Sequence, residues 1–107
     1  MNRQLTMLIV DDMEVERISF AEIFKDEYQI LEAENGKQAM EQLEQQKVHI
    51  VLLDLCMPVM DGFEVIREMK QQDKYADIPI VAKTAIDEKT EVKALEAGAD
   101  EYIFSPC

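Results

Sequence analysis

Three aspartates directly follow two short apolar runs of the sequence. Asp11 and Asp12 come after LTMLIV at 5–10, and Asp54 comes after VHIVLL at 48–53. Taken singly, each is most simply a loop aspartate at a helix N-cap. If the two runs lie side by side, however, the carboxylates converge and repel one another unless a positive charge lies among them. A hard cation such as Mg²⁺ suits such a site, because it prefers oxygen ligands and leaves positions for phosphate oxygens.

The elements that must position these aspartates follow from hydrophobic periodicity. Short apolar runs predict strands over 5–10, 28–33, 48–53, 78–82 and 102–104. Helical spacing of apolar residues predicts helices over about 14–25, 36–46 and 61–71, and a fourth that contains Val92 and Leu95 and ends at Gly98, a residue suited to a left-handed cap.

This alternation of strands and helices predicts an α/β fold with a doubly wound, five-stranded parallel sheet. Helices are expected on both faces of the sheet. Ligands of such sheets bind beyond the carboxyl ends of the strands. The three aspartates stand at those ends, which is where we look for chemistry.

Composition narrows the function further. The 107 residues suffice for one domain, and 23 acidic against 11 basic residues give a formal charge of −12. Such a chain repels phosphate backbones and anionic lipid surfaces, so direct nucleic-acid or membrane binding is disfavoured. No apolar run approaches the roughly 20 residues that span a bilayer. The N-terminus lacks the features of a signal peptide, and a cytoplasmic location is expected.

Four segments together resemble the receiver domain of two-component response regulators, a family that includes chemotaxis regulators. They are LIVDD at 8–12, VLLDLCMPVMDG at 51–62, AKTA at 82–85 and GADEY at 98–102. The resemblance implies the flavodoxin-like strand order 2-1-3-4-5. It also implies one receiver domain over 1–107, shortened at its C-terminus and part of a longer protein, because the family's last helix is missing.

The same resemblance implies the chemistry. Asp54 is expected to accept a phosphoryl group from a sensor histidine kinase or phosphotransfer protein, forming an acyl phosphate. Mg²⁺ would be held by Asp12 directly, by Asp11 chiefly through water, by Asp54 and by the backbone carbonyl of Cys56. Thr84 would donate a hydrogen bond to a phosphoryl oxygen, and Tyr102 would swing inward as Thr84 moves. An output domain beyond Cys107 and a homodimer are further expectations.

The sequence departs from the family pattern at two places. Ser105 stands where the family has a lysine that pairs with the acceptor and then with the phosphoryl group. Lys83 is a poor substitute on sequence grounds, because strand side chains alternate and Lys83 should point away if Thr84 points at the site. Without the last helix, Ile103 or Phe104 should lie partly bare.

The remaining residues with reactive side chains have simpler interpretations. His49 is expected to be structural, near the start of the third strand and opposite the site. A Cys56–Cys107 disulfide is excluded if one strand separates the two residues, because about 10 Å then lies between them. Four glutamates are most simply solvated helix faces: Glu14, Glu16, Glu41 and Glu44.

Three alternative functions stay open or are disfavoured. A degenerate receiver could act as a docking or scaffold domain that needs no phosphorylation. A haloacid-dehalogenase phosphatase would need a second acid two residues after Asp54, where Cys56 stands. A flavodoxin-type FMN binder would need a hydroxyl- and glycine-rich loop after the first strand, where the aspartates would repel the FMN phosphate.

Overall fold

The computed structural model describes residues 4–55, 61–84 and 88–104. These ranges contain five strands and five helices, which alternate except where α4 directly follows α3. In chain order they are β1 Leu5–Val10, α1 Glu14–Phe24, β2 Tyr28–Ala33, α2 Gly36–Gln45, β3 Ile50–Asp54, α3 Asp61–Gln71, α4 Asp73–Ala76, β4 Ile80–Thr84, α5 Glu88–Ala97 and β5 Glu101–Phe104. None of the helices in the described ranges is long and apolar enough to cross a membrane.

The strands form one parallel sheet in the order β2-β1-β3-β4-β5, which confirms the predicted fold class and order. The register brings the strand ends level with one another. Val10 lies opposite Leu53, so Asp11 and Asp54 follow at the same height on neighbouring strands. Asp54 in turn lies opposite Lys83 on β4. The acidic strand ends and the end of β4 therefore share one edge of the sheet.

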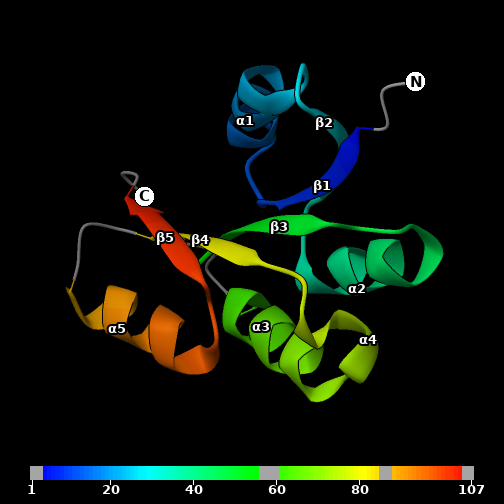
Figure 1. Ribbon diagram of the computed structural model, residues 1–107. Coiled ribbons are helices and arrows are strands. Elements are labelled where there is room, and N and C mark those ends of the chain that lie inside the picture. Colours follow the sequence, from blue (N-terminus) through cyan, green and yellow to red (C-terminus); the bar gives the residue numbers. More distant parts are fainter. Residues whose placement is uncertain (1–3, 56–60, 85–87, 105–107) are drawn as a thin grey trace.

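The two faces of the sheet are covered unequally (Figure 1). The helices α2 to α5 lie on one side, and α1 lies on the other. On the α2–α5 side, a large core of buried residues includes Leu8, Leu53, Ile66 and Met69. On the α1 side, the buried core comprises Met7, Ile9 and Leu52, with partly buried residues of α1 and the strands packed against it.

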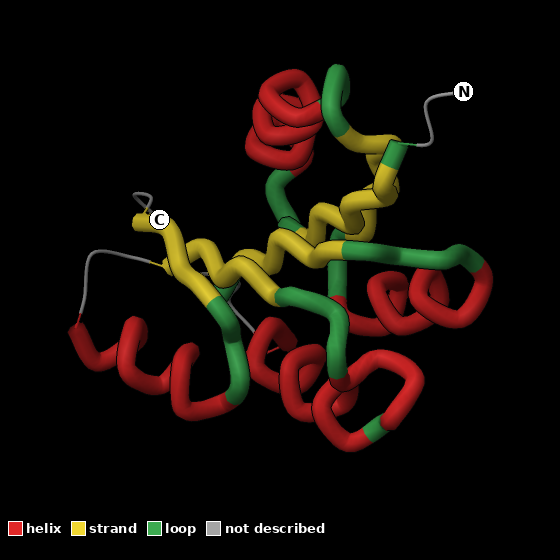
Figure 2. The backbone as a smooth tube through the Cα atoms, in the orientation of Figure 1, coloured by secondary structure: helices red, strands yellow, loops and turns green. Residues whose placement is uncertain are grey.

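Element boundaries differ from the prediction mainly around β4. This strand begins at Ile80 rather than 78, because Ile78 donates a backbone hydrogen bond to Tyr75 in the turn that closes α4. Pro79 has no N–H to donate to the ladder. The four-residue helix α4 escaped prediction because it is too short to show a period (Figure 2). β4 also ends two residues later than predicted, at Thr84.

The end of α5 confirms the predicted left-handed cap. Gly98 has a φ of 121°, in the region that favours glycine. Its N–H donates to the carbonyl of Leu95, and that of Ala99 donates to the carbonyl of Ala94. This pair of bonds is the Schellman pattern. It turns the chain sharply from α5 into β5.

Some of the apolar residues whose spacing predicted α1 and α5 are exposed rather than buried in the core. Val15 and Ile18 on α1 are 73% and 50% exposed, and Val92 and Leu95 on α5 are 50% and 43% exposed. Helical spacing therefore identified these helices without identifying their buried faces. Ile103 on β5 is 36% exposed, which confirms the expected bare position there.

Candidate phosphoacceptor and metal site

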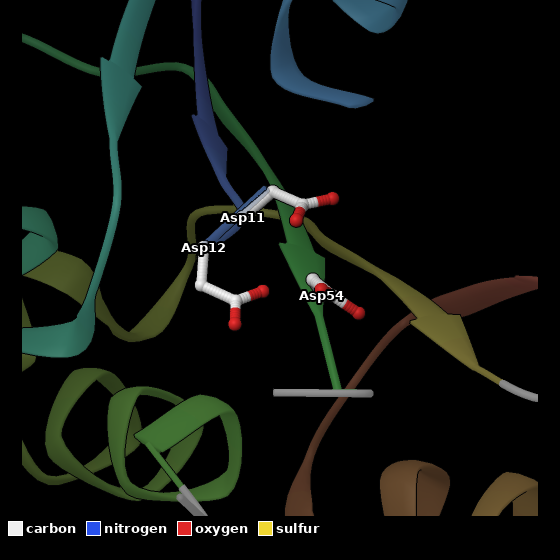
Figure 3. A group of neighbouring side chains, drawn as sticks. All are labelled: Asp11, Asp12 and Asp54. Carbon is white, nitrogen blue, oxygen red and sulfur yellow. The ribbon is translucent and has the colours of Figure 1, made fainter. Parts of the chain in front are cut away.

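The three aspartates converge at the carboxyl ends of β1 and β3, as predicted (Figure 3). One ligand oxygen of each lies within 4.8 Å of the others. Asp11 and Asp54 are buried, at 1% and 3% exposure, whereas Asp12 is exposed. Two buried carboxylates beside an exposed one form an acidic cluster that a cation can approach from the side of Asp12.

Asp11 is held from several sides. Its N–H continues the β1–β2 ladder by donating to the carbonyl of Ala33, 3.0 Å away. Its Oδ1 accepts from the N–H of Met13 at 2.9 Å, an Asx-type bond that turns the chain toward α1. Arg17 of α1 donates through Nη1 to the Asp11 carbonyl at 2.8 Å. The start of α1 is thereby tied to the end of β1, and Oδ2 of Asp11 faces the pocket.

Lys83 lies beside this acidic cluster, and the expectation that it would point away was wrong. Its Nζ lies 3.2 Å from Oδ2 of Asp11 and 3.9 Å from Oδ1 of Asp54. It also pairs with the Glu16 carboxylate of α1. The alternation rule holds, since Lys83 and Thr84 lie on opposite faces. The error lay in assigning the site to the face on which Thr84 lies. The site sits at the edge of the sheet formed by the carboxyl ends of the strands, and the long Lys83 side chain reaches that edge from the α1 side.

The lysine is enclosed as well as paired. Its side chain is 1% exposed, and its Nζ lies 5.8 Å from the centre of the Phe20 ring. Burial disfavours the charged form, but the hydrogen bond with Glu16 and the charges of Asp54 and Asp11 outweigh it, so the pKa of Lys83 lies above its usual 10.5. The ammonium is therefore fully charged at neutral pH.

Thr84 approaches the same edge from the other face of the sheet. It is completely buried, and its Oγ1 has no hydrogen-bond partner among the described residues. An unpartnered buried hydroxyl is costly, on the order of 1–3 kcal/mol. Tyr102 on β5 pairs with Ala82, two residues before Thr84, and packs partly buried against the larger core. Thr84 and Tyr102 therefore share the α2–α5 face.

Gly62, in the first turn of α3, permits a close approach to the acceptor strand. A Cβ at this position would lie 2.7 Å from the Asp54 carbonyl oxygen and 2.7 Å from Cδ2 of Leu55. Any side chain here would force the helix or the strand end to shift. The glycine thus lets α3 begin directly beside Asp54.

Several predicted positions fall elsewhere. Cys56, Ser105 and Cys107 lie outside the described residues. His49 accepts a hydrogen bond at Nδ1 from the Thr6 N–H, 3.0 Å away. It lies just before β3, at the far end from the aspartates, which confirms its structural role.

Sequence reasoning missed two pocket residues, Glu16 and Lys83. Glu16 was expected on a solvated face, but its side chain is only 29% exposed and its carboxylate pairs with Lys83. The unbalanced charge of the three aspartates was the available signal, because it called for a cation. No pattern in the sequence, however, links a residue of α1 to one 67 positions later.

Comparisons with known proteins identify the family of this chain. The family model of the response regulator receiver domain matches residues 7–107. The chemotaxis protein CheY of Halobacterium salinarum is 40% identical over 101 residues, which cover 94% of this chain and 83% of that protein. The chain belongs to the response regulator receiver family.

Two further relatives show the range of proteins that contain such a unit. The histidine kinase P4 of Formosa agariphila is 38% identical over 102 residues, covering 94% of this chain but 7% of that protein. The structure of the chemotaxis protein CheY4 of Vibrio cholerae has a TM-score of 0.89 at 24% identity, covering 98% of this chain and 89% of that one. The latter likeness is one of fold.

Proposed function

We propose that this chain is a phosphoacceptor unit in which Asp54 takes a phosphoryl group from a histidine kinase or phosphotransfer protein. The observation that carries the proposal is the convergence of Asp11, Asp12 and Asp54 within 4.8 Å. A carboxylate oxygen of Asp54 attacks phosphorus, and the bond between phosphorus and the donor nitrogen breaks. The donor nitrogen takes a proton from solvent, and Asp54 becomes an acyl phosphate.

The residues present fit a magnesium ion. Asp11, Asp12 and Asp54 offer the hard carboxylate oxygens that Mg²⁺ prefers, and three protein ligands leave room for water and phosphoryl oxygens. By resemblance, the backbone carbonyl of Cys56 is a further ligand. When bound, the metal supplies positive charge to the equatorial oxygens of the phosphoryl group. The charge balance supports this assignment, because the Lys83 ammonium pairs with three carboxylates, those of Asp11, Glu16 and Asp54, and Asp12 adds a fourth negative charge to the group.

The response to phosphorylation is assigned to Thr84 and Tyr102. The Thr84 hydroxyl, unpartnered among the described residues, would gain an acceptor in a phosphoryl oxygen. Movement of Thr84 would change the packing at the end of β4, where β5 and Tyr102 are its neighbours. Phosphorylation would thus shift the balance between two arrangements of the surface around Thr84 and Tyr102. Partner proteins would distinguish the two arrangements.

The wider setting is part of the same proposal. The output surface would serve a partner protein, a further domain of a longer chain or a second copy of this one. Location in the cytoplasm, and no direct contact with nucleic acid or membrane, accord with the family and with the charge of −12. Receiver domains are signalling domains, and only self-phosphorylation and self-dephosphorylation are expected as activity.

The alternative function, a docking domain that works unphosphorylated, was suggested by Ser105 at the family's lysine position, and membership of the receiver family does not favour it. Incubation with Mg²⁺ and phosphoramidate, followed by intact mass measurement, separates the two. We expect one added phosphoryl group in the natural chain and none in Asp54→Asn. No adduct in either protein would favour the docking domain, and an adduct in both would refute Asp54 as the acceptor.

The metal assignment has its own test. Mg²⁺ binding to the folded state should raise the melting temperature, and the rise should grow with the logarithm of Mg²⁺ concentration above Kd. Asp12→Ala should abolish most of that rise, because it removes the exposed ligand of the pocket. NaCl at equal ionic strength controls for non-specific screening of the acidic surface. Equal rises in the natural chain and in Asp12→Ala would remove Asp12 from the metal site.

A further inference from the structure

The ammonium of Lys83 is the feature of the pocket that neither the metal site nor the acceptor explains. It is buried on the α1 side of the sheet and lies 3.9 Å from Oδ1 of Asp54. It lies closer to Asp11 and also pairs with Glu16. A buried cation beside the acceptor is placed to interact with whatever the acceptor carries.

Strand register fixes the position of Lys83 relative to Asp54. Asp54 and Lys83 are register partners on adjacent parallel strands, so their side chains leave the same face at the same height. The Phe20 ring of α1 lies 5.8 Å from Nζ. Pre-organised charge of this kind stabilises developing negative charge without reorganising during the reaction.

Phosphorylation changes the charges that compete for this ammonium. Before transfer, Lys83 is shared among Glu16, Asp11 and Asp54. After transfer, Asp54 carries a phosphoryl group with more negative charge and more acceptor oxygens than a carboxylate. The partly exposed Glu16 is the partner that water can solvate most easily once it is released.

We propose that Lys83 supplies, from β4, the fixed cation that pairs with the phosphoryl group on Asp54, and that Glu16 is the partner that it gives up. Lys83 keeps its proton throughout; it forms an ion pair and transfers nothing. This inference rests on the proposed function of Asp54. It assigns to Lys83 the role of neutralising the phosphoryl group, which Ser105 cannot fill because serine carries no charge.

The test compares phosphorylation rates in the full chain. With Mg²⁺ and phosphoramidate, Lys83→Met should slow the appearance of the phosphoryl adduct by about a hundredfold or more, the scale for removing one preorganised stabilising group. Lys70→Met is the matched control, because Lys70 donates to the Ala76 carbonyl and lies near Asp100, away from the pocket. It should keep the natural rate.

Two further measurements separate a role in the pocket from damage to the fold. Magnesium should bind Lys83→Met more tightly than the natural chain, since the pocket loses a repelling positive charge, whereas a misfolded site would bind it more weakly. Beryllofluoride, a phosphoryl analogue, should raise the melting temperature of Lys83→Met less than that of the natural chain. Glu16→Gln should be phosphorylated at least as fast as the natural chain, because it competes less for Lys83.

The outcomes distinguish this inference from the proposed function. A natural chain that is phosphorylated on Asp54, with Lys83→Met equally fast and equally responsive to beryllofluoride, would refute the role of Lys83 alone. A rate lost equally in Lys83→Met and Lys70→Met would also refute it. A natural chain that gains no phosphoryl group would refute both proposals together. Restoration of the rate in Lys83→Met by a second change, Ser105→Lys, would support the inference.

Discussion

The two faces of the sheet both end at the edge that carries the three aspartates, but different interactions stabilise them. The α2–α5 face is held by a continuous apolar core in which Leu53, Ile66 and Met69 are completely buried. The α1 face has a small apolar core, and ion pairs take the place of apolar packing at the carboxyl ends of its strands. There Lys83 joins the carboxylates of β1, β3 and α1.

This difference indicates a division of labour. Apolar packing is insensitive to charge, so the α2–α5 face can hold the strands in register while chemistry proceeds at their ends. Ion pairs respond directly to an added charge, so phosphorylation would first change the ion pairs on the α1 face. Thr84 is the exception on the packed face, because its buried hydroxyl has no partner among the described residues.

The largest expected effect comes from breaking the packed face. Ile66 of α3 is fully buried, and Ile66→Ala should lower the free energy of unfolding by about 2–5 kcal/mol through lost burial and the cavity left behind. Urea denaturation measures the loss. A change below about 1 kcal/mol would mean that this face is less tightly packed than the buried core implies.

An intermediate effect is expected from the charged face, and it should depend on pH. Lys83→Met should cost about 1–3 kcal/mol at neutral pH without Mg²⁺, the usual scale for a buried hydrogen-bonded charge. Because the pKa of Lys83 is raised above 10.5, its contribution is complete below pH 10.5 and is lost as the pH rises through the folded-state value.

Denaturation of the natural chain and of Lys83→Met between pH 7 and 11.5 tests this sign. The stability difference should stay constant up to about pH 10 and then shrink, given the usual lysine pKa. A difference that already declines between pH 7 and 9 would show that the lysine is not held in its charged form by the pocket. Lys70→Met serves again as the control for general loss of positive charge.

The smallest effect is expected on the outer surface of α1. Ile18 is half exposed, and Ile18→Ala should change the free energy of unfolding by less than about 0.5 kcal/mol, as is usual for surface positions. The same chemical change at Ile66 provides the contrast. A loss at Ile18 as large as that at Ile66 would show that the outer side of α1 is buried by association in solution.

Much of the fold was predictable because it depends on local patterns. The apolar runs at 5–10 and 28–33 became β1 and β2 at the predicted residues. Gly98 ends α5 as expected, since a left-handed cap is a local requirement. The later start of β4 and the short helix α4 were not predictable, because they depend on the turn around Ile78 and Pro79. Neither leaves a periodic signal.

The site divides in the same way. Residue type and position after an apolar run placed Asp11, Asp12 and Asp54 at strand ends, and parallel-sheet topology brings such ends together. The partner of those acids depended on strand register, which alone sets Asp54 opposite Lys83, and on the packing of α1 that brings Glu16 within reach. Lys83 and Asp11 are 72 residues apart, so only tertiary structure could make them a pair. The alternation rule places Lys83 on the opposite face from Thr84, and it is strand register that puts Lys83 on the same face as Asp54.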